Sequence, residues 1–83
     1  MNNLGNVYYH GHGVQQDYNQ AATWYRKAAE AGNANGMNNL AWMYEHGQGV
    51  PGDRDQAVTW YREAARLGNQ LALDNLKRLG QNP

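Results

Sequence analysis

Apolar side chains recur along this chain at the spacing of an amphipathic helix. Positions i, i+3, i+4 and i+7 fall on one face of a helix, so residues at this spacing form a single apolar stripe. Strand formers are scarce, because isoleucine is absent and alanine is frequent, which also favours helices. The clearest stripes are Met37, Leu40, Ala41 and Tyr44 in one segment, and Ala57, Trp60, Tyr61, Ala64 and Ala65 in the next.

Start and stop signals flank these stripes. Asp17 and Asp53 each precede a glutamine by three residues, a spacing that predicts a capping box at a helix start. Gly32 and Gly68 follow the longer stripes, where a left-handed cap ends a helix. Together these signals predict five helices, at about residues 1–10, 17–31, 35–46, 53–67 and 70–79.

The sequence repeats itself with a period of 36 residues. When residues 1–36 are laid on residues 37–72, 20 of the 36 positions are identical and no gap is needed. Residues 73–83 begin a third, partial copy that supplies one helix and a polar C-terminal cap. Such a period indicates a solenoid, in which each helix pair buries its apolar face against the next pair. We therefore expect one repeat domain over residues 1–83.

The composition narrows the classes of partner and of chemistry. Lys and Arg number 7, as do Asp and Glu, whereas nucleic acids and anionic membrane surfaces attract an excess of basic groups. We expect neither as a partner. Cysteine is absent, which excludes disulfides, thiolate zinc sites and a cysteine nucleophile. The N-terminal stretch has no basic segment followed by an apolar one, and we expect a soluble protein of the cytoplasm or the periplasm.

Several motifs recur in both copies of the repeat. They are Leu-x-x-x-Tyr, Gly-x-Gly-Val, an Asp, and Ala-x-x-Trp-Tyr-x-x-Ala-Ala-x-x-Gly. In these motifs the chain resembles the Sel1-like repeat, a relative of the tetratricopeptide repeat, whose period is 34. The resemblance implies an all-α fold, a right-handed α/α solenoid of antiparallel helix pairs. It also implies an adaptor or scaffold, often in bacterial signalling or host contact. One departure is Ala41, where the first copy has Gly5.

The histidines are the most evident candidate metal ligands. His10 and His12 lie two positions apart, and neutral imidazoles bind zinc, copper or nickel. A site needs three or four convergent ligands, but His46, the equivalent of His10, is expected on the order of 10 Å away. His12 is replaced by Gln48 in the second copy. We therefore interpret His10 and His46 as helix-end residues, where positive charge is favourable, and predict no metal and no cofactor.

Neither the glycines nor the carboxylates indicate an enzyme. Phosphate-binding glycine loops follow a strand, whereas these lie between two predicted helices. We expect the glycines to form turns, with Val14 and Val50 filling the gap between the helices. Asp17 and Asp53 are explained as helix caps. The chain also has no serine.

Trp42 departs from the repeat. The same position holds Asn6 in the first copy and Arg78 in the third, so packing does not dictate it. By contrast, we expect the recurring Trp and Tyr of the longer helices in the core. In related solenoids the first helix of each repeat lines the concave surface, and aromatic and arginine side chains are frequent binding hot spots. The candidate partner-binding residues on this face are Asn2, Asn6, Tyr9, Asn38, Trp42, Glu45, Asp74 and Arg78.

These features favour a protein-interaction module, an adaptor or scaffold that presents a concave groove to a protein or a peptide. One alternative is a structural repeat unit, or part of a longer solenoid, that associates weakly with copies of itself through an N-terminal face with Leu4, Val7 and Tyr8. A second alternative is that Trp42 only packs on a neighbouring helix. A histidine-based metal-binding or enzymatic protein is the most distant hypothesis.

Overall fold

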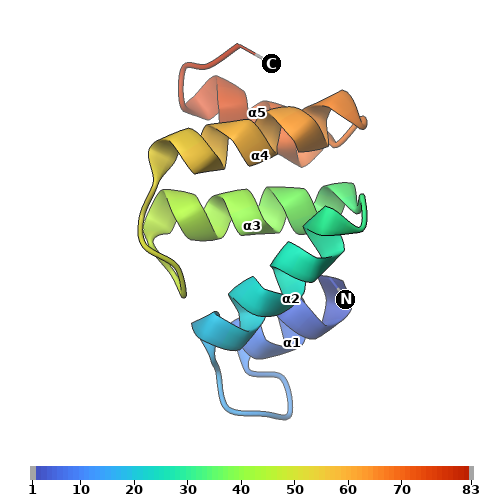
Figure 1. The fold of residues 1–83 in the computed structure, drawn as a ribbon, viewed down its shortest axis with the longest axis vertical. Coiled ribbons are helices and arrows are strands. Elements are labelled where there is room, and N and C mark those ends of the chain that lie inside the picture. The colour runs from blue at the N-terminus through green and yellow to red at the C-terminus, as the bar shows by residue number, and fades with distance from the viewer. Residues whose placement is uncertain (1, 83) are drawn as a thin grey trace.

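The computed structural model describes residues 2–82, which form helices joined by short loops (Figure 1). The helix pairs are stacked along the long axis of the molecule, which measures 37 × 22 × 17 Å. The expected all-α solenoid is confirmed, and every helix boundary lies within one residue of its predicted position. The helices are α1 (Asn2–His10), α2 (Tyr18–Glu30), α3 (Ala34–His46), α4 (Arg54–Arg66) and α5 (Gln70–Arg78).

The second helix of each repeat begins at an aspartate cap. The Asp17 carboxylate accepts from the backbone N–H of Gln20 at 3.1 Å, and Asp53 makes the same bond in the second repeat. The reciprocal half of the expected capping box was predicted wrongly. The Asp17 backbone N–H, which the Gln20 side chain was expected to bind, donates to the Tyr8 carbonyl at 2.9 Å. The cap thus ties α2 back to the end of α1.

A Gly-Asn pair ends one helix and starts the next. Gly32 and Gly68 have φ values of 88° and 89°, the left-handed conformation predicted for them. The following residues, Asn33 and Asn69, are N-caps whose side chains each accept at 2.8 Å from the backbone N–H three residues on. These two caps were not predicted, although asparagine is a preferred N-cap residue.

The core is centred where α3 packs between α2 and α4. Leu40, Ala41 and Tyr61 are fully buried, as their stripes predict. Met43 is also fully buried, although it lies off the predicted stripe of α3. Because α3 contacts both α2 and α4, its buried face is wider than one stripe.

The two recurring tryptophans are less buried than the sequence-based expectation. Trp60 is partly buried and packs against the core, whereas Trp24 is partly buried outside it, and Lys27 places its ammonium 4.6 Å from the centre of the Trp24 ring. The adjoining tyrosines, Tyr25 and Tyr61, are buried at 3% and 0% exposure. A helix face that meets its neighbours at an angle buries one of two adjacent aromatic positions more deeply than the other.

Gly5 allows α1 to approach α2 closely. A Cβ atom at this position would collide with the ring of Tyr25, so no larger residue fits without displacing that ring. The second repeat has Ala41, which is fully buried, at the equivalent position. The absence of a side chain at Gly5 therefore makes room for the Tyr25 ring in the first repeat.

The segment after α5 folds back onto α4. The Leu79 and Asn82 carbonyls accept hydrogen bonds from Arg54 at 3.0 Å and Arg62 at 3.1 Å. Leu79 also packs against the core. These contacts attach the segment to the last helix pair.

Candidate functional site

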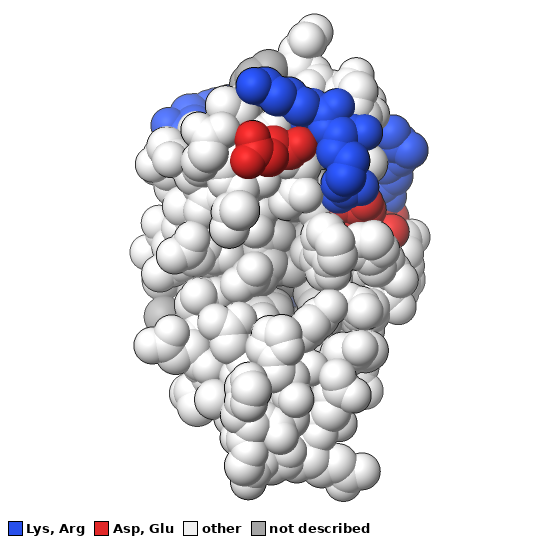
Figure 2. Space-filling view, turned by 180° about the vertical axis from the view of Figure 1, so that it is seen from behind, with Lys and Arg blue, Asp and Glu red and all other residues white. Residues whose placement is uncertain are grey.

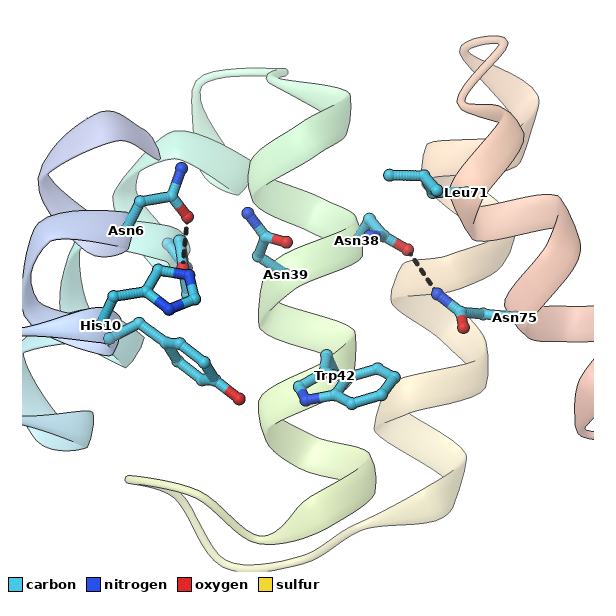
Figure 3. A pocket seen from close by; sticks show the side chains of 9 residues that line it. Asn6, His10, Asn38, Asn39, Trp42, Leu71 and Asn75 are labelled. Atoms are coloured by element: carbon cyan, nitrogen blue, oxygen red, sulfur yellow. Dashed lines mark hydrogen bonds between the residues drawn. The ribbon is translucent and has the colours of Figure 1, made fainter.

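A groove crosses the first helices of the three successive repeats (Figure 3). Its volume is about 400 Å³, within the range of about 300–1,000 Å³ that is typical of ligand sites. Its walls come from α1, α3 and α5, with one tyrosine from α2. The lining residues are Asn6, Tyr9, His10, Tyr25, Asn38, Asn39, Trp42, Leu71 and Asn75.

The structure brings most of the predicted binding residues to this groove. Four of them line it directly, and three more contact or support lining residues. Asp74 is the exception, because it is exposed and accepts from Gln70 of its own helix at 3.0 Å. The four that line the groove are Asn6, Tyr9, Asn38 and Trp42, and the three supporting residues are Asn2, Glu45 and Arg78.

Asparagine side chains connect the repeats along the groove. The Asn39 Nδ2 donates to Asn2 Oδ1 at 2.9 Å, between α3 and α1. In the same way the Asn75 Nδ2 donates to Asn38 Oδ1 at 3.0 Å, between α5 and α3 (Figure 3). Both bonds join residues 37 positions apart, and we call them the asparagine ladder. Since each bond fixes an amide in one orientation, the groove presents rigid polar groups.

Trp42 contacts two side chains, His46 of its own helix and Arg78 of α5. Its ring is 4.1 Å from the ring of His46, centre to centre. The Arg78 guanidinium carbon is 5.6 Å from the Trp42 ring centre, a distance at which cation–π attraction operates. Trp42 is only partly buried. It therefore both contacts a side chain of α5 and lines the groove.

Glu45 fixes the position of Arg78. Its two carboxylate oxygens each accept from Arg78 at 2.7 Å, and one also accepts from the Tyr61 hydroxyl at 2.8 Å. The hydrogen bonds from Arg78 lower the pKa of Glu45 below its usual 4.5, outweighing the opposite effect of burial. In turn, burial and the bond to Glu45 raise the pKa of Tyr61.

The equivalent tyrosine of the first repeat has a different acceptor. The Tyr25 hydroxyl donates to Asn6 Oδ1 at 2.6 Å. Burial, with a smaller contribution from Tyr9, raises the pKa of Tyr25 to about 12. The Tyr9 hydroxyl donates to Gln48 at 3.0 Å and so ties α1 to the loop after α3.

Sequence reasoning missed five lining residues. The repeated asparagines carried a usable signal, because they recur at the same positions of successive repeats. His10 was interpreted only as a helix-end residue, and Leu71 stands one repeat period after Asn35, so the two residues differ although their positions are equivalent. Tyr25 was placed in the core, which it also joins. The five are His10, Tyr25, Asn39, Leu71 and Asn75.

The histidines lie at helix ends, as predicted. His10 and His46 occupy the last turns of α1 and α3, and glycines with positive φ, 72° at Gly11 and 64° at Gly47, turn the chain after them. The rings of His10 and His12 are 5.4 Å apart. Within residues 2–82, no group of three His, Cys, Asp or Glu side chains is arranged to hold a metal ion.

Val14 does not fill a gap between helices, so that prediction was wrong for the first repeat. Val14 is 43% exposed, whereas Val50 packs against the core. The loop of the second repeat approaches the start of α2 so closely that a Cβ on Gly49 would clash with the Tyr18 backbone. A Cβ on Gly13 would meet nothing within 4 Å. The first loop therefore has no such neighbour among the described residues.

Charged side chains are unevenly distributed. On the face turned away from the viewer in Figure 1, they gather at the C-terminal end and leave most of the surface without charge (Figure 2). The segment that forms α1 has no Asp, Glu, Lys or Arg. Among the helices described, none combines the length and the apolar character that a bilayer crossing requires.

A family model for the Sel1 repeat matches residues 1–33 and 34–69 of the chain. A search of curated proteins finds no match. Solved structures do match: a Sel1 repeat protein from Oxalobacter formigenes is 44% identical, with a TM-score of 0.90, over 94% of this chain and 22% of its own.

Two further bacterial structures are similar. A protective antigen of uropathogenic Escherichia coli strains, which displays an SLR fold, is 42% identical with a TM-score of 0.86, over 88% of this chain and 16% of its own. The Helicobacter pylori cysteine rich protein B is 33% identical with a TM-score of 0.84, over 90% of this chain and 56% of its own. The chain thus spans only part of each of these three relatives.

Proposed function

The chain belongs to the Sel1 repeat family, and we propose that it is a protein-binding module whose groove holds a segment of its partner. Repeats of this family generally act as protein-interaction modules. The specific role of the groove, and its use of Trp42 as an anchor, are our proposal.

One observation carries this proposal: residues that differ between the repeats line the same groove as residues that the repeats share. The asparagines of the ladder recur in successive repeats. By contrast, Asn6 and Trp42 differ in residue type although they occupy the same position of the repeat. Both line the groove. A position that varies between repeats while the packing around it is kept is available for recognition, and tryptophan and tyrosine dominate binding hot spots.

No residue of the groove is arranged for catalysis in this proposal. Its polar side chains are amides, hydroxyls and one imidazole, and the carboxylate of Glu45 is held by Arg78. The module would act through shape and hydrogen bonding, as a scaffold or an adaptor.

Removal of the Trp42 side chain tests the proposal. Peptides selected on the wild-type chain from a random display library should bind Trp42→Ala at least about tenfold more weakly, since hot-spot truncations cost about 2 kcal/mol or more. Trp24→Ala is the matched control, because Trp24 lies on α2 outside the groove lining. Equal losses in both variants, or unfolding of Trp42→Ala by circular dichroism, would contradict the proposal.

End-to-end assembly of copies is a second candidate, favoured by the pattern of the ladder. Asp74 occupies the repeat position of the ladder acceptors Asn2 and Asn38, and Asn3 occupies that of the donors. A second copy stacked on α5 could add a bond from its Asn3 to Asp74. Sedimentation velocity over a range of concentrations should then show association that Asp74→Lys removes. A concentration-independent monomer would exclude this candidate.

A further inference from the structure

We propose a second binding site, away from the groove, that takes the phenol side chain of a tyrosine from a partner protein. A pocket of about 450 Å³ opens between α4 and α5, the last two helices in Figure 1. It is lined by Arg62, Ala65, Arg66 and Leu73. None of these residues lines the groove, so this inference goes beyond the proposed function and does not depend on it.

The preceding repeat covers the positions that line this pocket. Ala29 and Met37 lie one repeat period before Ala65 and Leu73. They are 2% and 7% exposed, whereas Ala65 and Leu73 are only partly buried. The fold thus fills this place in the first repeat, and within residues 2–82 it leaves the equivalent place open.

A tyrosine provides part of the cover in the first repeat. Arg26 lies one period before Arg62. Its guanidinium carbon is 5.7 Å from the centre of the Tyr44 ring, and its Nη2 donates to the Tyr44 hydroxyl. One period after Tyr44 stands Gly80, which lies beyond the end of α5. Arg62 therefore repeats the guanidinium of Arg26 without the aromatic ring that Arg26 holds.

The Arg62 guanidinium retains donors for a ligand. Its Nε donates to the Asn82 carbonyl at 3.1 Å, and its Nη2 donates to the Gln81 side chain at 3.4 Å. The second of these bonds is longer than usual, so a better acceptor can replace Gln81. Among the hydrogen bonds of the described residues, none engages Nη1 of Arg62. No carboxylate of residues 2–82 pairs with Arg62 either.

A phenol matches this pocket better than an anion does. Ala65 and Leu73 provide apolar surface against which a ring can pack, and a guanidinium attracts the face of an aromatic ring. Two other cations of the chain also lie against aromatic rings. Arg66, the second cation of the pocket, pairs with Glu63 at 3.3 Å. The pocket therefore does not present two unpaired charges to an anion.

Variants of Arg62 test this assignment. Arg62→Ala removes the guanidinium, and Arg62→Lys keeps the charge but loses the planar group. Arg54→Ala is the matched control, because Arg54 also lies on α4 and donates to a carbonyl of the C-terminal segment, that of Leu79 at 3.0 Å. Arg54 does not line the pocket. Both arginines are exposed, and circular dichroism verifies that the variants fold.

The probes are N-acetyltyrosinamide, N-acetylphenylalaninamide and inorganic phosphate, each titrated into the isotope-labelled chain and followed by NMR. We expect the tyrosine probe to shift the signals of Ala65 and Leu73. It should bind at least about threefold more tightly than the phenylalanine probe, because only its hydroxyl accepts from a charged donor. Arg62→Ala should weaken its binding at least about fivefold, Arg62→Lys about threefold, and Arg54→Ala less than twofold.

Four results would overturn the inference. The first is equal binding of the two aromatic probes, or no binding of the tyrosine probe. The second is an equal loss in Arg62→Ala and Arg54→Ala, because release of the C-terminal segment would then explain it. The third is tighter binding of phosphate, which would indicate an anion site. The fourth is a shift of the same signals with protein concentration alone, which would place a second copy in the pocket. None of them bears on the groove, which Trp42→Ala tests separately.

Discussion

Arg78 holds the Glu45 carboxylate with two hydrogen bonds of 2.7 Å each. This bidentate pair joins α5 to α3. It also holds Arg78 against the ring of Trp42. One ion pair thus contributes both to the stacking of repeats and to the wall of the groove.

Arg78→Ala should lower the free energy of unfolding by about 1 kcal/mol, the upper end for partly exposed pairs, because the geometry is bidentate. Urea denaturation measures the change. Arg66→Ala is the control, since Arg66 pairs with Glu63 at 3.3 Å with side chains 73% and 44% exposed. That variant should lose less than about 0.5 kcal/mol. Equal losses would show that the bidentate pair adds no stability of its own.

Acid should destabilise the chain through Glu45. The pKa of Glu45 is lowered from 4.5 in the folded state, first by the hydrogen bonds from Arg78, so the unfolded chain takes up the proton first. Stability from this group is therefore complete above about pH 5 and is lost as the pH falls through 4.5 toward the folded pKa. Thermal unfolding between pH 7 and pH 3 should show a smaller decrease for Glu45→Gln than for the wild type. Parallel curves would contradict this assignment.

Alkali should reveal two tyrosines that resist ionisation. Burial raises the pKa of Tyr25 to about 12 and that of Tyr61 further, while the chain has 6 tyrosines in all. Because the unfolded chain ionises near 10, stability should fall as the pH rises above that value. An absorbance titration should show the last two tyrosines ionising only as helicity is lost, and one fewer in Tyr25→Phe. Ionisation of all six before unfolding would refute the burial argument.

Gly5→Ala should destabilise the protein by up to about 2 kcal/mol. Alanine favours a helix over glycine by about 1 kcal/mol, but the added Cβ would collide with the Tyr25 ring, and overpacking costs about 1–3 kcal/mol or more. Asn3→Ala at an exposed position of α1 isolates the propensity effect and should be neutral or slightly stabilising. Thermal denaturation compares the two variants. A more stable Gly5→Ala would mean that α1 and α2 are farther apart than described.

The helices could be predicted from local signals because those signals agree with one another. The aspartates before α2 and α4 and the glycines after them mark boundaries that the structure confirms within one residue. The repeat then makes the solenoid predictable, since identical helix pairs bury equivalent faces. What failed was the assignment of Trp24 to the core, because periodicity gives the face of a helix but not the angle at which another helix crosses it.

The groove was predicted as a concave surface lined by the first helices, but only part of its lining was predicted. Asn6 and Trp42 were found because the repeats differ there, and comparison between repeats detects differences. Asn39 and Asn75 were missed because they do not differ. Their pairing joins non-equivalent positions of successive repeats, and such a pairing depends on how far one helix is displaced along the next, which the sequence does not state.

The spacing of the asparagine ladder has a consequence for chains of other lengths. Each bond joins residue i to residue i+37, one more than the repeat period. Duplication of a complete repeat of 36 residues keeps this spacing between paired asparagines and adds one asparagine–asparagine hydrogen bond. The unit that can be exchanged or multiplied in this protein is therefore the complete helix pair with its two adjacent asparagines, and a longer array built from it would carry a proportionally longer row of oriented amides.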